Sequence, residues 1–175
     1  EKARLEAMPS RGYQPIDGLA AYNQAVQVML FGKDSPLLAE GKVVTAQALG
    51  GTGALKVGAD YLKRLLPGAT VYIGDPSWEN HRAIFETAGF PVDSYPYYDA
   101  ATRGVNFAAM KSCLNSLQAG SIIVLHACCH NPTGADLSEA QWREIIEVIQ
   151  ARGLVPFIDM AYQGFADGIA EDALA

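Results

Sequence analysis

From about residue 42 onward, short apolar runs rich in β-branched residues alternate with amphipathic runs of helical period. This alternation, with nearly continuous apolar strands, predicts an α/β fold in which a mostly parallel sheet carries helices on both faces. A single domain is expected, with residues 1–41 as an N-terminal helical segment and residues 42–175 as the β/α core. The predicted strands are 43–49, 70–74, 91–97, 121–128 and 155–159, and the predicted helices are 17–32, 52–66, 77–88, 106–118 and 138–151.

The polar and aromatic residues that stand out in this sequence follow predicted strands. Parallel sheets bind ligands beyond the carboxyl ends of their strands, and those ends meet at one edge. The four segments concerned are "GGTGA" (50–54), "DPSWENH" (75–81), "CHNPTG" (129–134) and "DMAYQGF" (159–165). We therefore expect these segments to lie together and to form a ligand site.

The stretch "LGGTGALKVG" (49–58) places glycines where the chain turns into a helix. Backbone amides at a helix N-terminus bind phosphate readily, and the Thr52 hydroxyl would add a donor. The stretch is not a P-loop, because Lys56 is not preceded by Gly or followed by Ser or Thr. It is not a dinucleotide fingerprint either, because Lys56 occupies the position of the third glycine of that motif. A phosphate cradle and a plain tight turn with close helix packing both explain these glycines.

Residues in two further segments, 75–81 and 159–165, can be interpreted either as functional or as purely structural. Trp78 could stack on a planar ring or simply cover the core, and His81 could orient a neighbouring carboxylate or be structural. Asp159 ends an apolar strand, where a carboxylate needs a cation or strong donor to stay ionised. It could instead cap backbone amides, and Tyr162 could direct its hydroxyl to the same pocket.

The run "IIVLHACCHNPTG" raises the question of a metal site. His126, Cys128 and His130 would share one face if the strand ran that far, and such a set could hold zinc. However, the apolar run indicates a central buried strand, no Cys-x-x-Cys spacing is present, and free cysteine is commonly a small buried hydrophobe. No metal is therefore predicted, and Asn131, held extended before a proline at the strand end, is expected to offer its amide to a phenolate oxygen.

Composition narrows the possible partners to small molecules. The net charge is -6 and the pI is near 5.0, without a basic stripe, which argues against nucleic acid and anionic membranes. The longest apolar runs fall short of the ~20 residues of a membrane helix. Three cysteines make a poor disulfide framework and favour a reducing compartment, so a cytoplasmic protein is expected. The charged helical start without Met and the helical ending "AEDALA" suggest a piece of a longer protein.

A phosphate cradle, an aromatic platform, an amide donor and a buried carboxylate together suit pyridoxal phosphate. The sequence here resembles the class I aspartate and aromatic amino acid aminotransferases, which are fold-type I pyridoxal-phosphate enzymes. The matching segments, in order over nearly the whole chain, are "GYQPIDGL", "LFGKDS", "GGTGALKVGADYLKR", "DPSWENH", "CCHNPTGADL" and "DMAYQGF". The resemblance implies the large cofactor-binding domain of that fold, in part, with its C-terminal part and the small domain absent.

The resemblance also implies roles for individual residues. Gly51 and Thr52 would bind the cofactor phosphate, and Trp78 would stack on the pyridine ring. Asp159 would pair with the pyridinium nitrogen, and Trp78 and Asp159 would be the catalytic residues of this chain.

Further roles follow from the same resemblance. Asn131 and Tyr162 would hydrogen-bond the phenolic oxygen of the ring, and His81 and His126 would support the carboxylate that faces the ring nitrogen. Tyr13 resembles the tyrosine that reaches the phosphate bound in the partner subunit, so a homodimer is implied. The expected reaction is transfer of an amino group between an aromatic or dicarboxylic L-amino acid and a 2-oxo acid such as 2-oxoglutarate, with the wording of two motifs closer to the aromatic branch.

One departure from the family pattern matters for activity. The family's Schiff-base lysine lies a few dozen residues beyond the "DMAYQGF" aspartate, and only 16 residues follow Asp159 here. Among the six lysines only Lys56 lies near the phosphate-binding turn, and its place on the helix carries it away from the ligand, so residues 1–175 alone are not expected to transaminate. A lyase or decarboxylase on the same fold and a non-catalytic cofactor-binding or interaction module are the alternatives.

Overall fold

The computed structural model describes residues 2–7 and 12–175, which separate into two compact units, Glu1–Ala48 and Leu49–Ala175. In the first unit the helices are α1 (Lys2–Glu6), α2 (Ala20–Phe31) and α3 (Pro36–Ala39). In the second unit the helices are α4 (Gly50–Leu65), α5 (Glu79–Thr87), α6 (Phe107–Ser116) and α7 (Glu139–Arg152), followed by a 3₁₀ turn, η1 (Glu171–Ala173). The predicted helices are therefore confirmed, with ends that shift by a few residues.

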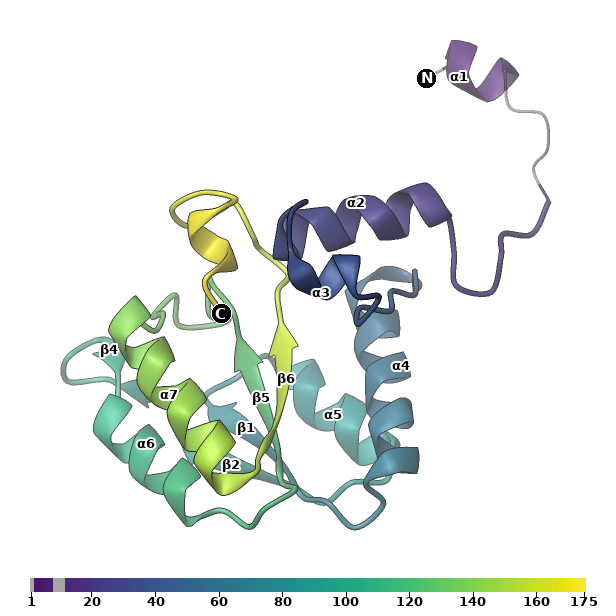
Figure 1. The fold of residues 1–175 in the computed structure, drawn as a ribbon. Helices are drawn as coiled ribbons and strands as arrows, with labels where there is room; N and C mark the ends of the chain where they lie inside the picture. The colour runs from purple at the N-terminus through teal and green to yellow at the C-terminus, as the bar shows by residue number, and fades with distance from the viewer. Residues whose placement is uncertain (1, 8–11) are drawn as a thin grey trace. The chain divides into compact units, whose positions relative to one another are not determined.

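A parallel sheet of four strands forms the centre of the second unit (Figure 1). Its strands are β1 (Val71–Asp75), β2 (Val92–Pro96), β5 (Ile122–His126) and β6 (Val155–Asp159), in the order β2-β1-β5-β6. Each corresponds to a predicted strand. Two further strands, β3 (Tyr98–Asp99) and β4 (Gly104–Val105), form a small antiparallel hairpin that the sequence analysis did not predict.

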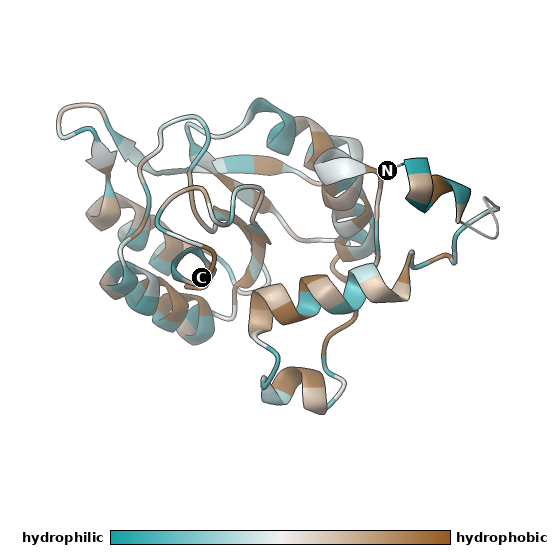
Figure 2. Ribbon diagram, turned by 90° about the horizontal axis from the view of Figure 1, so that it is seen from above, coloured by the Kyte–Doolittle hydropathy of each residue, from teal (hydrophilic) through white to brown (hydrophobic). Residues whose placement is uncertain are grey.

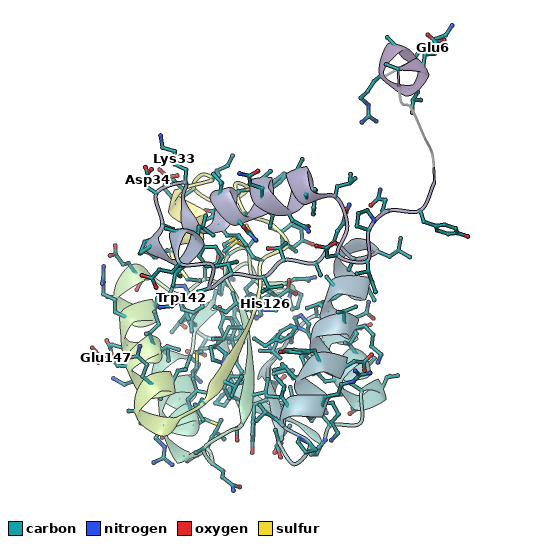
Figure 3. The ribbon with its side chains drawn as sticks, turned by 45° about the vertical axis from the view of Figure 1, so that its right-hand side comes forward. Glu6, Lys33, Asp34, His126, Trp142 and Glu147 are labelled. Carbon is teal, nitrogen blue, oxygen red and sulfur yellow. The ribbon has the colours of Figure 1, made fainter. Side chains whose placement is uncertain are left out.

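Helices cover both faces of this sheet, as predicted (Figure 1). On one face, α4 and α5 contribute Ala59 and Phe85, both fully buried, to a core cluster. On the other face, α6 and α7 contribute the fully buried Met110 and Ile145. Figure 3 shows Trp142 of α7 among the interior side chains and Glu147 on the outside of the same helix.

The β5 strand lies between β1 and β6 and is the most deeply buried strand. Ile122, Ile123, Val124 and Leu125 are each at most 2% exposed, because helices cover both sides of the strand. The prediction of a central buried strand at this place is confirmed. In β6, which lies at an edge of the sheet, partly buried and exposed residues alternate instead.

The predicted strand at 43–49 is wrong. The segment has no regular structure and pairs with none of the described strands, and Val44 and Leu49 are 93% and 94% exposed. Up to Ala48 it belongs to the first unit, in which the amide of Gln47 donates to the carbonyl of Asp17 at 2.9 Å. Apolar β-branched composition favours an extended chain, but a strand also requires a neighbouring backbone.

Local signals at the helix ends are more reliable than that strand signal. Ser138 and Gln141 form a capping box at the start of α7, and Gly153 ends the helix with a left-handed φ of 63°. Asn106 takes the N-cap position of α6, although its side chain makes no capping hydrogen bond. The predicted helix at 170–175 is reduced to the short 3₁₀ turn η1.

The first unit exposes much apolar side chain. Figure 2 shows α2 as predominantly hydrophobic along its length. Its exposed members include Tyr22 and Met29, each 48% exposed, and Phe31, which is 44% exposed. Within residues 2–7 and 12–175, no helix combines the length and the apolar character that crossing a membrane requires.

The strand order reverses between β1 and β5. From β1 the chain continues outward to β2, whereas β5 continues in the other direction to β6. The register between β1 and β5 covers only Val71 with Ile122 and Tyr72 with Ile123, so the pairing ends before their carboxyl ends. A reversal of this kind is where open α/β sheets bind ligands.

Candidate functional site

A pocket of about 160 Å³ lies beyond the carboxyl ends of the strands in the second unit. It lies at the reversal of strand order, since residues that follow β1, β5 and β6 all contribute to it. The lining residues are Gly51, Leu55, Trp78, His126, Asn131, Asp159, Ala161 and Tyr162. The predicted convergence at this sheet edge is therefore confirmed.

Larger hollows occur elsewhere on the same unit but lack this chemistry. One of about 410 Å³ lies between α7 and the segment around η1, and one of about 320 Å³ lies at the opposite end of the sheet, beside Leu66 and Ser121. Neither combines an aromatic face, an amide and a strand-end carboxylate that converge on one space. We therefore assign the candidate site by its residues rather than by its size.

At the floor of the site, Asp159 and His81 form a buried pair. The Nε2 atom of His81 lies 2.8 Å from Oδ2 of Asp159, and the Oγ atom of Ser77 lies 2.9 Å from Nδ1 of the same ring. His81 is 0% exposed and the Asp159 side chain is 15% exposed. If Ser77 donates to Nδ1, the Nε2 proton of the neutral imidazole points at Asp159 and provides the donor that a desolvated carboxylate needs.

A row of aromatic rings extends from this pair into the protein. The centroids of His81 and His126 are 5.0 Å apart, and those of His126 and His130 are 4.4 Å apart. His130 in turn stacks on Tyr97 at 4.0 Å and an interplanar angle of 15°. Burial, reinforced by the neighbouring histidines, lowers the pKa of His126 to about 4 and that of His130 to about 3. Both rings are therefore neutral at physiological pH.

Trp78 packs against the core and also lines the pocket, so its position is compatible with both interpretations that its sequence context allowed. It is the N-cap residue of α5 and packs partly buried against the core cluster on that face of the sheet. It also lines the pocket, and its ring meets His81 edge-on with centroids 5.5 Å apart. The indole can therefore present a face to a ligand while the core fixes its position.

The N-terminus of α4 lies where the phosphate-binding turn was expected. The helix begins at Gly50, so Gly51 and Thr52 belong to its first turn, whose amides have no partner within the helix. The N-cap residue Leu49 makes no side-chain capping bond. Gly51 lines the pocket, whereas Thr52 is exposed beside it and is not part of the lining.

No lysine occurs among the lining residues, all of which belong to the described part of the chain. Lys56 lies on the surface of α4, as predicted, where its Nζ atom pairs with Asp60 one turn further along. Lys111 pairs with Glu144 between α6 and α7 at 2.5 Å, away from the site.

Asn131 reaches the pocket by a route that differs from the prediction. The strand β5 ends at His126, and Asn131 lies five residues later, in a turn and not at the strand end. Between the strand and Asn131, Cys129 adopts a left-handed φ of 49°. Asp136 accepts hydrogen bonds from the amides of this turn, a role that the sequence analysis missed.

The two predicted tyrosines occupy different surroundings. Tyr162 follows β6, lines the pocket and is 43% exposed. Tyr13 belongs to the first unit, is fully exposed and is not among the lining residues, so its expected contact with a partner subunit stays a prediction.

The zinc alternative finds no support in the arrangement of its candidate ligands. In the described residues the set His126, Cys128 and His130 is not gathered around one point, and the only potential ligand group is His81, His126 and Asp159, within 4.8 Å of one another. The His81–Asp159 separation of 2.8 Å is shorter than the roughly 3.3 Å between two ligands of a tetrahedral zinc ion. This distance is that of a hydrogen bond.

Two residues of the site were missed from the sequence. Ser77 orients His81 from one turn earlier in the chain, and Asp136 holds the turn before Asn131. A serine at the entrance to α5 and an aspartate two residues after Gly134 were visible signals, because both residue types bond to nearby groups in turns. Neither signal reveals its partner without the fold.

Comparison with known proteins places these features in a family. Residues 1–175 match the family described as "Aminotransferase class I and II". The chain is 66% identical over 175 residues to an aspartate aminotransferase of Pseudomonas aeruginosa, covering 100% of the chain and 44% of that relative. It is 54% identical over 176 residues to an aromatic-amino-acid aminotransferase of Escherichia coli, covering 99% of the chain and 44% of the relative.

Solved structures show the same likeness. The chain superposes with a TM-score of 0.96 on an aromatic-amino-acid aminotransferase from Burkholderia pseudomallei covalently bound to pyridoxal phosphate, at 64% identity and over 98% of this chain and 43% of that one. The cytoplasmic aspartate aminotransferase of Saccharomyces cerevisiae gives a TM-score of 0.94 at 35% identity, over 98% and 42% of the two chains. The chain thus spans less than half the length of the relatives it matches.

Proposed function

Because this chain belongs to the class I and II aminotransferases, we propose that the whole protein transfers an amino group from an aromatic or dicarboxylic L-amino acid to a 2-oxo acid such as 2-oxoglutarate. The proposed cofactor is pyridoxal phosphate, which the Burkholderia relative binds covalently. The observation that carries the proposal is the convergence of Asp159, Trp78, Asn131 and Tyr162 on one pocket beside the N-terminus of α4.

The carboxylate of the site fits the ring nitrogen of this cofactor. Asp159 points into the pocket from the end of β6, and His81 fixes one of its oxygens. A negative charge beside a pyridine nitrogen raises the pKa of that nitrogen and keeps it protonated. When bound, the cofactor supplies an electron sink for bond breaking at the α-carbon of the amino acid.

The remaining lining residues fit the rest of the cofactor. The first-turn amides of α4 at Gly51 and Thr52 suit its phosphate, because they lack helix partners and carry the positive end of the helix dipole. Trp78 offers a ring face, while Asn131 and Tyr162 offer donors to a phenolic oxygen. In this proposal His81 holds the orientation of Asp159 through its hydrogen bond, and the neutral His126, which also lines the pocket, supports the pair by packing against His81.

The central test is substitution of Asp159 in the full-length protein. Asp159→Ala should reduce keto-acid production with aspartate, phenylalanine or tyrosine as donor by orders of magnitude. Asp167→Ala, which removes an exposed acid that does not line the pocket, is the matched control and should retain activity. Near-normal turnover of Asp159→Ala, or carbon dioxide release without keto-acid production, would contradict the proposal.

A homodimer is part of the same proposal. The first unit exposes Tyr13, Ile16 and Leu19, in addition to the apolar residues of α2, and exposed apolar surface of this kind suits a subunit interface. Tyr13 would contribute its hydroxyl to the phosphate site of the partner. Sedimentation equilibrium should give twice the mass of the chain, and Tyr13→Phe should weaken cofactor binding without changing that mass. A monomer with full activity would exclude this arrangement.

A further inference from the structure

A single carboxylate holds the turn that follows β5. The amide of Cys129 donates to Oδ2 of Asp136 at 2.7 Å, and the amide of His130 donates to Oδ1 at 2.8 Å. Both oxygens of one side chain therefore fix two consecutive peptide units. Hydrogen bonds to an ionised acceptor are among the stronger ones in proteins.

The turn needs such an anchor because of its backbone conformation. Cys129 has a φ of 49°, which L residues other than asparagine, aspartate and histidine rarely adopt. An unfavourable conformation persists only where surrounding contacts impose it. The two hydrogen bonds of Asp136 act on this residue and on the next one, so they hold the strained part of the turn directly.

The backbone that Asp136 holds leads directly into Asn131, the residue after His130. Its side chain lines the pocket but forms no hydrogen bond with any residue that the structure describes. Its direction therefore depends on the backbone that carries it. An amide that must meet one ligand atom requires a backbone with a single conformation.

Other contacts hold the far side of the turn, and apart from its bond to Asp136 the left-handed Cys129 makes one long contact, from its Sγ atom to the carbonyl of Tyr162 at 3.9 Å. The ring of His130 lies against Tyr97, and its Nδ1 atom lies 2.8 Å from Oγ1 of Thr133. The amide of Gly134 donates to the carbonyl of His130 at 2.7 Å. These contacts fix His130 and the residues after Asn131, whereas the left-handed residue before them is held through its amide by Asp136.

We propose that Asp136 is a positioning residue that aims the Asn131 amide at the phenolic oxygen of the cofactor, an inference that rests on the proposed function. Without the carboxylate, the turn samples other conformations and the amide donates less often. The cofactor then binds more weakly. Its ring oxygen also loses a donor that favours the ionised form, so the pH midpoint of its visible absorption change rises.

The test uses the full-length protein, stripped of cofactor and titrated with pyridoxal phosphate while tryptophan fluorescence is recorded. Asp136→Asn keeps the size of the side chain but turns one acceptor into a donor, and it should raise the apparent dissociation constant about tenfold. Asp99→Asn is the matched control, since Asp99 also closes a turn, accepting from the amide of Ala101 and the hydroxyl of Thr102 at 2.9 Å each, in the β3–β4 hairpin. It should leave the constant within about twofold.

A double-mutant cycle separates positioning from general damage. If Asp136 acts through Asn131, Asp136→Asn should add little to the loss already caused by Asn131→Ala. The pH midpoint of the bound cofactor's absorption should rise in both single variants, and more in Asn131→Ala. Full additivity of the two losses, or an unchanged midpoint in Asp136→Asn, would overturn the proposal.

Two controls keep the outcome decisive. Asp136→Glu retains the charge but moves both oxygens, so it should also weaken binding, and it replaces Asp136→Asn if that variant does not fold. If the unsubstituted protein fails to bind pyridoxal phosphate, the proposed function itself is wrong. If the unsubstituted protein binds pyridoxal phosphate and both Asp136 variants bind it with the same affinity, only the positioning role is wrong.

Discussion

Acidification should destabilise the second unit because two of its histidines are held neutral. The pKa of His126 falls to about 4, through burial first and then through the proximity of His81, while Asp159 and Asp136 act in the opposite direction. The pKa of His130 falls to about 3, again through burial first and then through the other two histidines. In the unfolded chain both would titrate near 6.5.

The sign of the effect follows from proton linkage. As the pH falls below 6.5, the unfolded chain binds protons at both histidines before the folded protein does, so the free energy of unfolding decreases. The stability that neutral histidines contribute is fully present above that pH and is lost as the pH falls toward the folded values. Between about pH 7.5 and about pH 5 the expected loss is about 2 kcal/mol for each histidine.

The assay compares urea unfolding at these two pH values for the cofactor-free full-length protein and for His130→Phe. Phenylalanine can keep the stack on Tyr97 but cannot titrate. The free energy of unfolding of His130→Phe should therefore decrease by about 2 kcal/mol less between the two pH values than that of the unsubstituted protein. Any structural cost of the substitution is present at both pH values and cancels in this difference.

Tyr97→Phe is the matched control for the same cluster. It removes the hydroxyl that donates to the carbonyl of Ala135 at 2.6 Å, but burial raises the pKa of Tyr97 above its usual value, so the phenol stays protonated throughout the range. Its cost should therefore be equal at both pH values. If the free energy of unfolding of His130→Phe decreases between the two pH values as much as that of the unsubstituted protein, the reasoning is refuted.

Three further expectations concern the ligand, the core and the covalent link. Trp78→Phe should retain much more cofactor binding and turnover than Trp78→Ala, because a smaller ring keeps part of the stack; equal losses would point to the indole N–H. Gly58→Ala would place a Cβ 2.8 Å from Cε2 of Phe157 and should lower the free energy of unfolding by about 1–3 kcal/mol, whereas Gly68→Ala meets nothing within 4 Å and should not. Residues 1–175 alone, treated with pyridoxal phosphate and borohydride, should show no specific labelling of a single lysine on peptide mapping and no keto-acid production, since no lysine lines the pocket.

The sheet and its helices could be predicted because their signals are local and repeated. The continuous apolar run at 122–125 indicates a strand buried on both faces, and the capping box of Ser138 fixes the start of α7. The shared edge of the parallel strands then brings Trp78 and Asp159 together without any knowledge of their contacts. Composition and period suffice for this much of the site.

The parts that could not be predicted depend on distant backbone. Residues 43–49 have strand composition, but the described sheet offers them no partner. Asn131 was expected at the strand end but lies five residues beyond it, and cysteine is not a residue type that indicates the left-handed conformation found at Cys129. The hydrogen bond between His81 and Asp159 joins residues 78 positions apart, a separation that no local pattern encodes.

Some polar residues of the site face the pocket, whereas others stabilise the loops that carry them, and the second group could not be recognised from the sequence. Asn131 and Tyr162 lie on the loops after β5 and β6, and neither side chain forms a hydrogen bond with a residue that the structure describes. Each loop is closed instead by an aspartate that bonds to backbone amides: Asp136 after β5, and Asp172 after β6, where the amides of residues 164 and 166–168 converge and lower the pKa of that carboxyl. An acid that stabilises a loop leaves the side chains of that loop free for a ligand. Substitution of such an acid should therefore reduce ligand affinity before it reduces the stability of the sheet.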